Sequence, residues 1–264
     1  MSTKIQILKN KKLKNPVLLV GLPGIGLVGK ITLDYLINSL KPKPTLFAKI
    51  TSDSFPPAVH AKNSLLELIS DDIYVFNYNK RDYLFLVGPV QPSLSSANNS
   101  TQHYEFSETV SNFAKKVGVK EIYTFAGLNI GQKRLNQKPR VLAVTSDEKT
   151  KKNIQKKKIK EVIFDSSATD TLISGVAGLL VGIAYNEHKI PGCCFMGETD
   201  QKLIFGDQGS AKSVLSVVCK MFPFKIDTKQ INKEAKKIEE SFNEITSKIK
   251  ELEKKKETPV SYIR

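Results

Sequence analysis

The residues best placed to do chemistry are glycines near the N-terminus, whose spacing resembles that of two nucleotide-binding loops. Gly24, Gly26 and Gly29 satisfy the dinucleotide fingerprint G-x-G-x-x-G, and Gly24, Gly29 and Lys30 match most of the P-loop pattern G-x-x-x-x-G-K-[ST]. In both loops, backbone N–H groups and the start of a helix bind phosphate oxygens. Ile31 stands where the P-loop requires a hydroxyl for Mg²⁺, so the P-loop pattern is incomplete.

These glycines also fit a purely structural turn between a strand and a helix. Glycine tolerates positive φ and the close approach of other backbone, and Gly21 adds a fourth such position before the loop. Asp53 lies about where a ribose-binding acid could sit, but Ser, Phe and two prolines follow it immediately. We predict a structural glycine loop formed by Gly21, Gly24, Gly26 and Gly29, with an anion site and a dinucleotide site as the alternatives.

The other chemistry-bearing residues form no recognisable constellation. The three histidines have no Cys or carboxylate at metal-ligand spacing, so we predict no metal site and no cofactor. Cys193 and Cys194 fall in one expected strand and face opposite sides, so they cannot act as a C-x-x-C pair. Acids cluster loosely at Glu198, Asp200 and Asp207. A strand-end loop with Glu198 and Asp200 could serve catalysis, but capping or turn roles fit better.

Apolar runs and helical stretches alternate along the chain and predict the elements that position these residues. We expect strands at Val17–Val20, Thr45–Ile50, Ile73–Tyr78, Tyr83–Val87, Glu121–Phe125, Val141–Val144, Val162–Phe164 and Gly192–Met196. We expect helices at Leu27–Leu40, Gln102–Lys116, Asp170–His188 and Ala211–Met221. Such alternation predicts an α/β fold whose sheet is covered by helices on both faces. A turn at residues 79–82 makes Ile73–Val87 a hairpin, so the sheet should be mixed rather than purely parallel.

The composition argues against several classes of protein. The chain has 264 residues, of which 40% are apolar, and no stretch predicts a membrane span or a signal peptide. Its three cysteines cannot form a disulfide framework, so we expect a reduced, cytoplasmic protein. The formal charge of +15 makes nucleic acid a partner to consider. Only four of the 41 basic residues are arginine, however, and the lysine-rich segment 149–160 has no aromatic residue, so we disfavour nucleic acid.

After Pro223 the apolar residues follow a heptad pattern, and Lys and Glu fill most positions between them. The pattern predicts a helix over Thr228–Lys256, within a segment 225–257, whose apolar stripe forms a coiled-coil seam between subunits. Packing of this stripe against the helix's own domain is the alternative. The residues of the predicted seam are Ile231, Ile238, Phe242, Ile245, Ile249 and Leu252.

The last residues of the chain, 258–264, are predicted to be a docking tail. Pro259 ends the helix, and apolar and aromatic residues follow it up to the terminal carboxylate. A large ring beside a free carboxylate is an element that a pocket on a partner protein can bind. We therefore predict that Val260, Tyr262, Ile263 and Arg264 bind another protein.

Seven segments in this order resemble a known protein family. They are Gly21–Gly29, Gly88–Pro92, Tyr104–Val110, Phe113–Val119, Ile122–Gly127, Ile173–Gly182 and Ile190–Thr199. Together they resemble the PAC2 family of archaeal homologues of proteasome-assembly chaperones, over roughly residues 15–220. The C-terminal helix and the tail fit the same resemblance, in which residues 1–224 form the core domain.

The resemblance implies a three-layer α/β/α core related to nucleoside phosphorylases, a homo-oligomer, and docking on the α-ring of the 20S proteasome. It further implies an assembly chaperone or activator that works without ATP. Some relatives end in a hydrophobic-Tyr-X motif that enters pockets between α-subunits, whereas Tyr262 is third from the end of this chain. We predict this non-enzymatic role. The alternative is a nucleotide-dependent enzyme, ligase-like or phosphorylase-like, that uses the Gly21–Lys30 loop.

Overall fold

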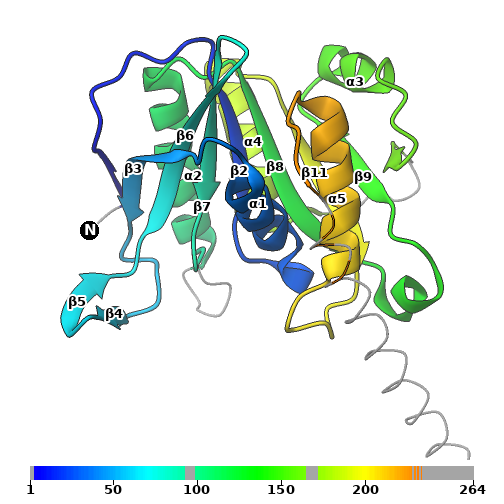
Figure 1. Ribbon diagram of the computed structural model, residues 1–264, viewed down its shortest axis with the longest axis horizontal. Helices are drawn as coiled ribbons and strands as arrows, with labels where there is room; N and C mark the ends of the chain where they lie inside the picture. Colours follow the sequence, from blue (N-terminus) through cyan, green and yellow to red (C-terminus); the bar gives the residue numbers. More distant parts are fainter. Residues whose placement is uncertain are drawn as a thin grey trace, which may run out of the picture.

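Helices cover both faces of one large sheet in the computed structural model, which describes residues 3–92, 99–164, 172–227, 229, 231 and 233 (Figure 1). The sheet has nine strands in the order β1-β3-β6-β7-β2-β8-β11-β9-β10, and a separate hairpin pairs β4 with β5. The strands are β1 (Lys4–Ile7), β2 (Val17–Gly21), β3 (Thr45–Thr51), β4 (Val59–Lys62), β5 (Leu65–Leu68), β6 (Asp71–Tyr78), β7 (Arg81–Val87), β8 (Glu121–Asn129), β9 (Val141–Thr145), β10 (Val162–Ile163) and β11 (Gly192–Thr199).

The helices of the described chain form two outer layers. They are α1 (Val28–Ser39), α2 (Asn99–Lys116), α3 (Glu148–Gln155), α4 (Val176–His188) and α5 (Gln208–Met221), with short 3-10 turns η1 (Ile25–Leu27) and η2 (Gly131–Asn136). Helices α1, α3 and α5 share one hydrophobic core with the sheet, and α2 and α4 share the other. The predicted α/β fold with both faces of the sheet covered is therefore confirmed. None of the helices described is long and apolar enough to cross a bilayer.

The sheet is mixed, as predicted. Strands β7, β2, β8 and β11 run parallel to their neighbours in that order. Strand β6 is antiparallel to β7, and β9 is antiparallel to β11. In β2 every residue is buried, because Val17 and Leu19 face one core while Leu18 and Val20 face the other. A central strand covered on both faces is apolar throughout rather than alternating, which explains why its run was visible in the sequence.

All eight strands expected from the sequence are present, and three others were not expected. Strands β1, β4 and β5 have four residues each and are largely exposed. Their sequences therefore do not show the alternation of apolar and polar residues that identifies a strand with one buried face. The helix expected at Asp170–His188 begins later, at Val176, because Gly175 has φ of 88° and breaks the helical path before it. Cys193 and Cys194 do lie on opposite faces of β11, in separate hydrophobic clusters.

The C-terminal segment is described only at its start. Ile231, the first residue of the predicted seam, is 1% exposed and lies in the hydrophobic core of its own domain. Its backbone N–H donates to the Tyr35 hydroxyl, which itself donates to the carbonyl of Asp227. For Ile231 the contact is therefore internal and not a seam between subunits. The other five seam residues and the tail residues Val260, Tyr262, Ile263 and Arg264 lie outside the described residues.

Candidate functional site

Most of the segments singled out in the sequence meet at one edge of the sheet, where β2, β7, β8 and β11 end. We call it the carboxyl edge. The glycine loop follows β2, the Gly88–Pro92 loop follows β7, η2 follows β8, and residues 200–207 follow β11. The β4–β5 hairpin projects from the same edge, because β3 enters it there and β6 returns from it (Figure 1). In α/β proteins this edge is the usual place for ligand and partner sites.

The glycine loop connects β2 to α1 through the single turn η1. Gly26 has φ of 60°, in the left-handed region that glycine adopts without strain. Leu27, the residue before α1, is also left-handed, with φ of 49°. Gly24 is extended, with φ of −163°, a conformation open to any residue. Of the three glycines in the fingerprint, only Gly26 therefore has a backbone conformation that favours glycine.

Close packing explains the other glycines of the loop. A Cβ atom on Gly29 would clash with the carbonyl oxygen of Phe125 in β8, and one on Gly21 would clash with the carbonyl of Gly29. A Cβ on Gly26 would clash with the Thr199 hydroxyl at the end of β11. Nothing lies within 4 Å of a Cβ on Gly24. The loop is thus pressed onto β8 and β11 and does not form an open cradle there, which supports the structural interpretation.

Alanine substitutions at two of these glycines should have very different effects. We expect Gly29→Ala to lower the free energy of unfolding by roughly 1–3 kcal/mol, because backbone must move to admit the methyl group. The matched change Gly24→Ala should alter it by less than about 0.5 kcal/mol, because the site is open and extended. Urea unfolding followed by circular dichroism measures both. Equal effects at the two positions would contradict the close packing.

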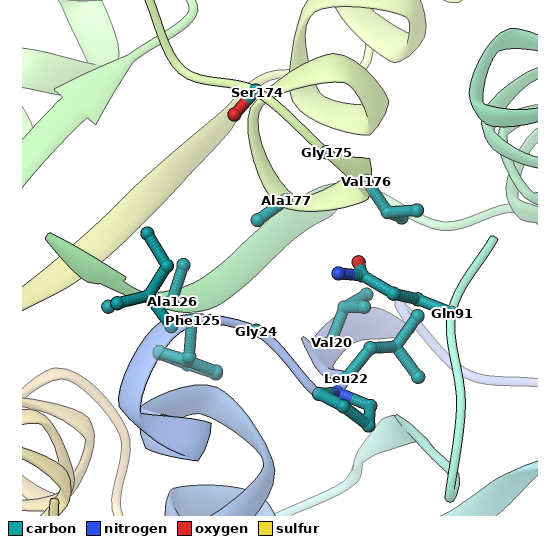
Figure 2. Close-up of a pocket in the computed structure, with 13 residues that line it drawn as sticks. Val20, Leu22, Gly24, Gln91, Phe125, Ala126, Ser174, Gly175, Val176 and Ala177 are labelled. Carbon is teal, nitrogen blue, oxygen red and sulfur yellow. The ribbon is translucent and has the colours of Figure 1, made fainter. Parts of the chain in front are cut away.

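A small pocket lies between the glycine loop and the start of α4 (Figure 2). Its volume is about 110 Å³, and its walls include Leu22, Gly24, Gln91 and Ala177. Small-molecule sites usually have volumes of roughly 300–1,000 Å³, so this pocket is small for a nucleotide. The other residues that a nucleotide site would use lie away from this pocket. Lys30 Nζ donates to Asp34 Oδ2 at 2.6 Å, and Asp53, at the position where a ribose-binding acid could sit, lines the groove beside the β4–β5 hairpin.

Asp207 holds three segments of the carboxyl edge together: η2, the start of α5 and the glycine loop. Its carboxylate accepts hydrogen bonds from Arg134 Nε at 2.7 Å and Nη2 at 2.8 Å, so η2 is held by a bidentate pair. The same carboxylate caps α5 by accepting from the Ser210 N–H and also accepts from the Thr199 hydroxyl. The Asp207 N–H donates to the carbonyl of Gly26 at 2.8 Å, which fixes the glycine loop. Asp207 therefore caps α5 and fixes η2 and the glycine loop to it.

Glu198 is also engaged by an arginine. Its carboxylate accepts from Arg140 Nη2 at 2.6 Å and from the Arg140 backbone N–H at 2.9 Å. Burial alone would raise the pKa of Glu198, but the hydrogen bonds and charge of Arg140 outweigh it and hold that pKa below its usual range. Asp200 accepts from the Lys202 N–H in a turn. Glu198, Asp200 and Asp207 thus all have structural partners, and within the described residues no cluster of His, Cys, Asp and Glu with metal-ligand geometry is found.

Exposed apolar side chains mark the same edge. Ile204 and Phe205, in the loop after β11, are 71% and 88% exposed, and Ile25 in the glycine loop is 43% exposed. The β4–β5 hairpin adds Val59, Leu65, Leu66 and Leu68, all at least half exposed. A groove of about 640 Å³ runs beside this hairpin. Several exposed large apolar residues on one edge are typical of a protein-binding surface. We call these seven residues the apolar edge.

Sequence analysis located the glycine loop and the three acids but missed the rest of this site. The arginines that bind the acids are 58 and 73 residues away along the chain. The apolar edge was missed because an apolar run such as Leu65–Leu68 predicts burial unless its surroundings are known. Spacing alone carried no signal for either feature.

Comparisons with known proteins are consistent with this fold. The model described as PAC2 family matches residues 18–246. An uncharacterized protein of Methanocaldococcus jannaschii is 29% identical over 234 residues, which are 88% of this chain and 84% of that protein.

Two solved structures from Pyrococcus furiosus are similar to the chain. One is PbaB, described as an archaeal proteasome activator, with a TM-score of 0.83 and 30% identity over 93% of this chain and 99% of that one. The other is PbaA, described as an archaeal homolog of proteasome-assembly chaperone, with a TM-score of 0.70 and 21% identity over 97% of each chain. At its lower identity, PbaA shows a shared fold.

Proposed function

Because this chain belongs to the PAC2 family, we propose that it is a non-enzymatic, ATP-independent partner of the 20S proteasome, acting as an assembly chaperone or an activator. The observation that carries the proposal is the likeness to PbaB, described as a proteasome activator, which extends over 99% of that protein's chain. We further propose that the protein is cytoplasmic and that its core has a fold related to that of nucleoside phosphorylases but lacks their enzymatic activity.

Two features of the site support a binding role over the nucleotide-dependent alternative. The glycine loop is packed against Phe125 and Thr199, and Lys30 is paired with Asp34. Of the acids that could serve catalysis, Glu198 is bound by Arg140 and Asp200 by turn backbone. The apolar edge, in contrast, offers surface that a protein partner would cover.

The C-terminal residues supply the proposed contacts with other chains. In this proposal a helix over Thr228–Lys256 joins subunits through Ile238, Phe242, Ile245, Ile249 and Leu252 and builds a homo-oligomer. The tail from Val260 to Arg264 then docks on the α-ring. Several tails presented by one oligomer bind by avidity, so weak single contacts suffice.

Removal of the tail tests the proposed docking. We expect a chain that ends at Pro259 to lose at least about tenfold in affinity for 20S proteasome, because tyrosine rings often dominate small interfaces. Tyr262→Ala should reproduce most of the loss, and Ser261→Ala serves as the matched control. The measurement is binding to immobilised 20S proteasome, with light scattering to confirm an unchanged oligomer.

The outcomes separate docking by the tail from docking by the body. Undiminished binding after removal of the tail would reject the tail and assign the contact to the body, where Phe205→Asp on the apolar edge should then abolish it. Absence of binding by the full-length chain would reject the proposed function itself.

A further inference from the structure

The side of the sheet opposite the carboxyl edge is strongly basic, and we call it the basic edge. Here the loops that precede β2 and β8 meet the turn between β6 and β7, and the loop that leaves α3 begins on the same side before it descends to β10 (Figure 1). The exposed lysines of these segments are Lys9, Lys11, Lys12, Lys14, Lys80, Lys115, Lys116, Lys120, Lys156, Lys157 and Lys158. A concentration of one charge on one edge creates a field that attracts a partner of opposite charge.

A groove of about 520 Å³ lies within this basic edge, next to the outermost strand β1. Ile7, Leu13, Phe47 and Val117 give it apolar walls, and Lys9, Lys11, Lys12, Lys116 and Lys120 also line it. Lys11 donates to the buried carboxylate of Asp82 at 2.9 Å, which holds the loop before β2 in place. No ion pair with the other four lysines is found within the described part of the chain.

Strand β1 leaves one side of its backbone unpaired. In the described sheet it lies at the end of the strand order and pairs with β3 alone. Ile7 at its end is 39% exposed, and the following Leu8 is 44% exposed. An edge strand with free N–H and C=O groups can accept a further strand from another chain.

We propose that the groove and the free edge of β1 bind an extended acidic segment of a different protein. Its backbone adds to β1, its acidic side chains pair with Lys9, Lys12, Lys116 and Lys120, and an apolar side chain enters the groove. A second copy of this chain does not fit, because its equivalent surface carries the same charge. The chain's own C-terminus does not fit either, since residues 248–264 hold six basic and three acidic residues, a net charge of +3.

The lining of the groove favours a peptide over a nucleic acid. Base recognition uses arginine forks and exposed aromatic rings. The lining residues include no arginine, and their one aromatic side chain, Phe47, is 2% exposed. Arg81, on the same edge, already donates to Glu121 at 2.7 Å and to the Asn15 carbonyl. Lysine charge above an apolar groove and beside a free strand edge instead matches an acidic, extended polypeptide.

The test uses the full-length chain and a fluorescein-labelled peptide of about ten residues in which Glu and Asp surround a central Leu-Val pair. Fluorescence anisotropy should show binding that weakens as salt rises from about 50 mM to about 300 mM. The triple variant Lys12→Glu, Lys116→Glu, Lys120→Glu should bind at least about tenfold more weakly. The control Lys156→Glu, Lys158→Glu, Lys160→Glu has the same net charge but leaves the groove intact, and should bind within about threefold of the wild type.

Hydrogen exchange distinguishes strand addition from diffuse attraction. Bound peptide should slow the exchange of backbone amides in residues 3–8 and not in the α3 region. Equal losses of affinity in the two triple variants, or binding without protection of residues 3–8, would overturn the proposal. Tighter binding of a single-stranded oligonucleotide of matched charge at the same lysines would overturn it in favour of nucleic acid. Because no proteasome is present, the result is independent of the proposed function.

Discussion

Replacement of Arg134 by methionine is expected to lower the free energy of unfolding by roughly 3–5 kcal/mol. The side chains of Arg134 and Asp207 are 7% and 3% exposed, so water cannot take over the role of the guanidinium. The change leaves a buried carboxylate whose remaining donors, among the described residues, are the Thr199 hydroxyl and the Ser210 N–H. Breaking one side of a buried, bidentate pair is costly because the remaining charge stays desolvated.

Two further variants make this prediction specific. Arg140→Met removes a similar bidentate partner, from Glu198, but the Arg140 side chain is 54% exposed and Glu198 keeps the Arg140 backbone N–H. Its loss should therefore be smaller, about 1–2 kcal/mol. The double variant Arg134→Met, Asp207→Asn should recover much of the stability, because asparagine is uncharged and still caps α5. Urea unfolding at neutral pH, followed by circular dichroism, measures all three.

The result also bears on the apolar edge. Asp207 holds η2, the glycine loop and the start of α5 together, and the loops that carry Ile25 and Phe205 are its immediate neighbours in the chain or in space. Equal losses for Arg134→Met and Arg140→Met would show that Asp207 is not the central support of this edge. A double variant no more stable than the single one would show the same.

The second large effect concerns Asp71, whose side chain is fully buried at the start of β6. Asp71 is 0% exposed, and no hydrogen-bond partner of either carboxylate oxygen is found among the described residues. Burial raises the pKa of Asp71 from 3.8 to about 8, and the charge of Asp72 adds to the rise, whereas the nearby backbone of Val90 and the charge of Lys30 oppose it. The group is therefore protonated in the folded protein at neutral pH and ionised in the unfolded chain.

The sign of the pH dependence follows from this difference in bound protons. Between pH 3.8 and about 8 the folded state holds a proton that the unfolded state has lost. Stability therefore falls as pH rises through this window, by about 1.4 kcal/mol per pH unit from this group. Asp71→Asn keeps the size of the side chain and removes the ionisation, so we expect it to be roughly 3–4 kcal/mol more stable than the wild type near pH 7.

Urea unfolding of the wild type and of Asp71→Asn at about pH 4.5, 6 and 7.5 tests this expectation. The two proteins should have similar stability at the lowest pH and diverge as pH rises. The neighbouring, partly exposed Asp72 supplies the matched control Asp72→Asn, which should follow the wild-type profile. Parallel profiles for the wild type and Asp71→Asn would show that Asp71 is ionised in the folded protein.

Local patterns in the sequence were enough to place most elements of the fold. Continuous apolar runs marked β2 and β11 because these strands are buried on both faces. The hairpin of β6 and β7 followed from two apolar runs and the turn between them, although the turn has only the two residues Asn79 and Lys80 and not the four expected. The heptad period after Pro223 is also a local pattern, and it predicts a helix. It does not determine what each apolar residue packs against, because Ile231 packs into the core of its own domain.

The role of the glycine loop was decided by the tertiary structure. Its spacing fits a nucleotide fingerprint and a tight turn equally well, since both need small residues between a strand and a helix. The distinguishing contacts come from Phe125 and Thr199, which lie about a hundred residues or more along the chain. The order of strands in the sheet brings β8 and β11 beside β2, and no local pattern encodes that order.

The same reason applies to the charges and to the exposed apolar residues. The sequence alone determined that Asp200 and Asp207 follow a strand and that lysine dominates the positive charge, whereas Glu198, expected after the strand, lies within β11. Only the tertiary structure decided which arginines bind Glu198 and Asp207, that Asp71 is fully buried, and that the β4–β5 hairpin exposes its leucines. A side chain's own type and period set how it can interact, whereas its partner and its burial depend on segments that meet only when the sheet forms.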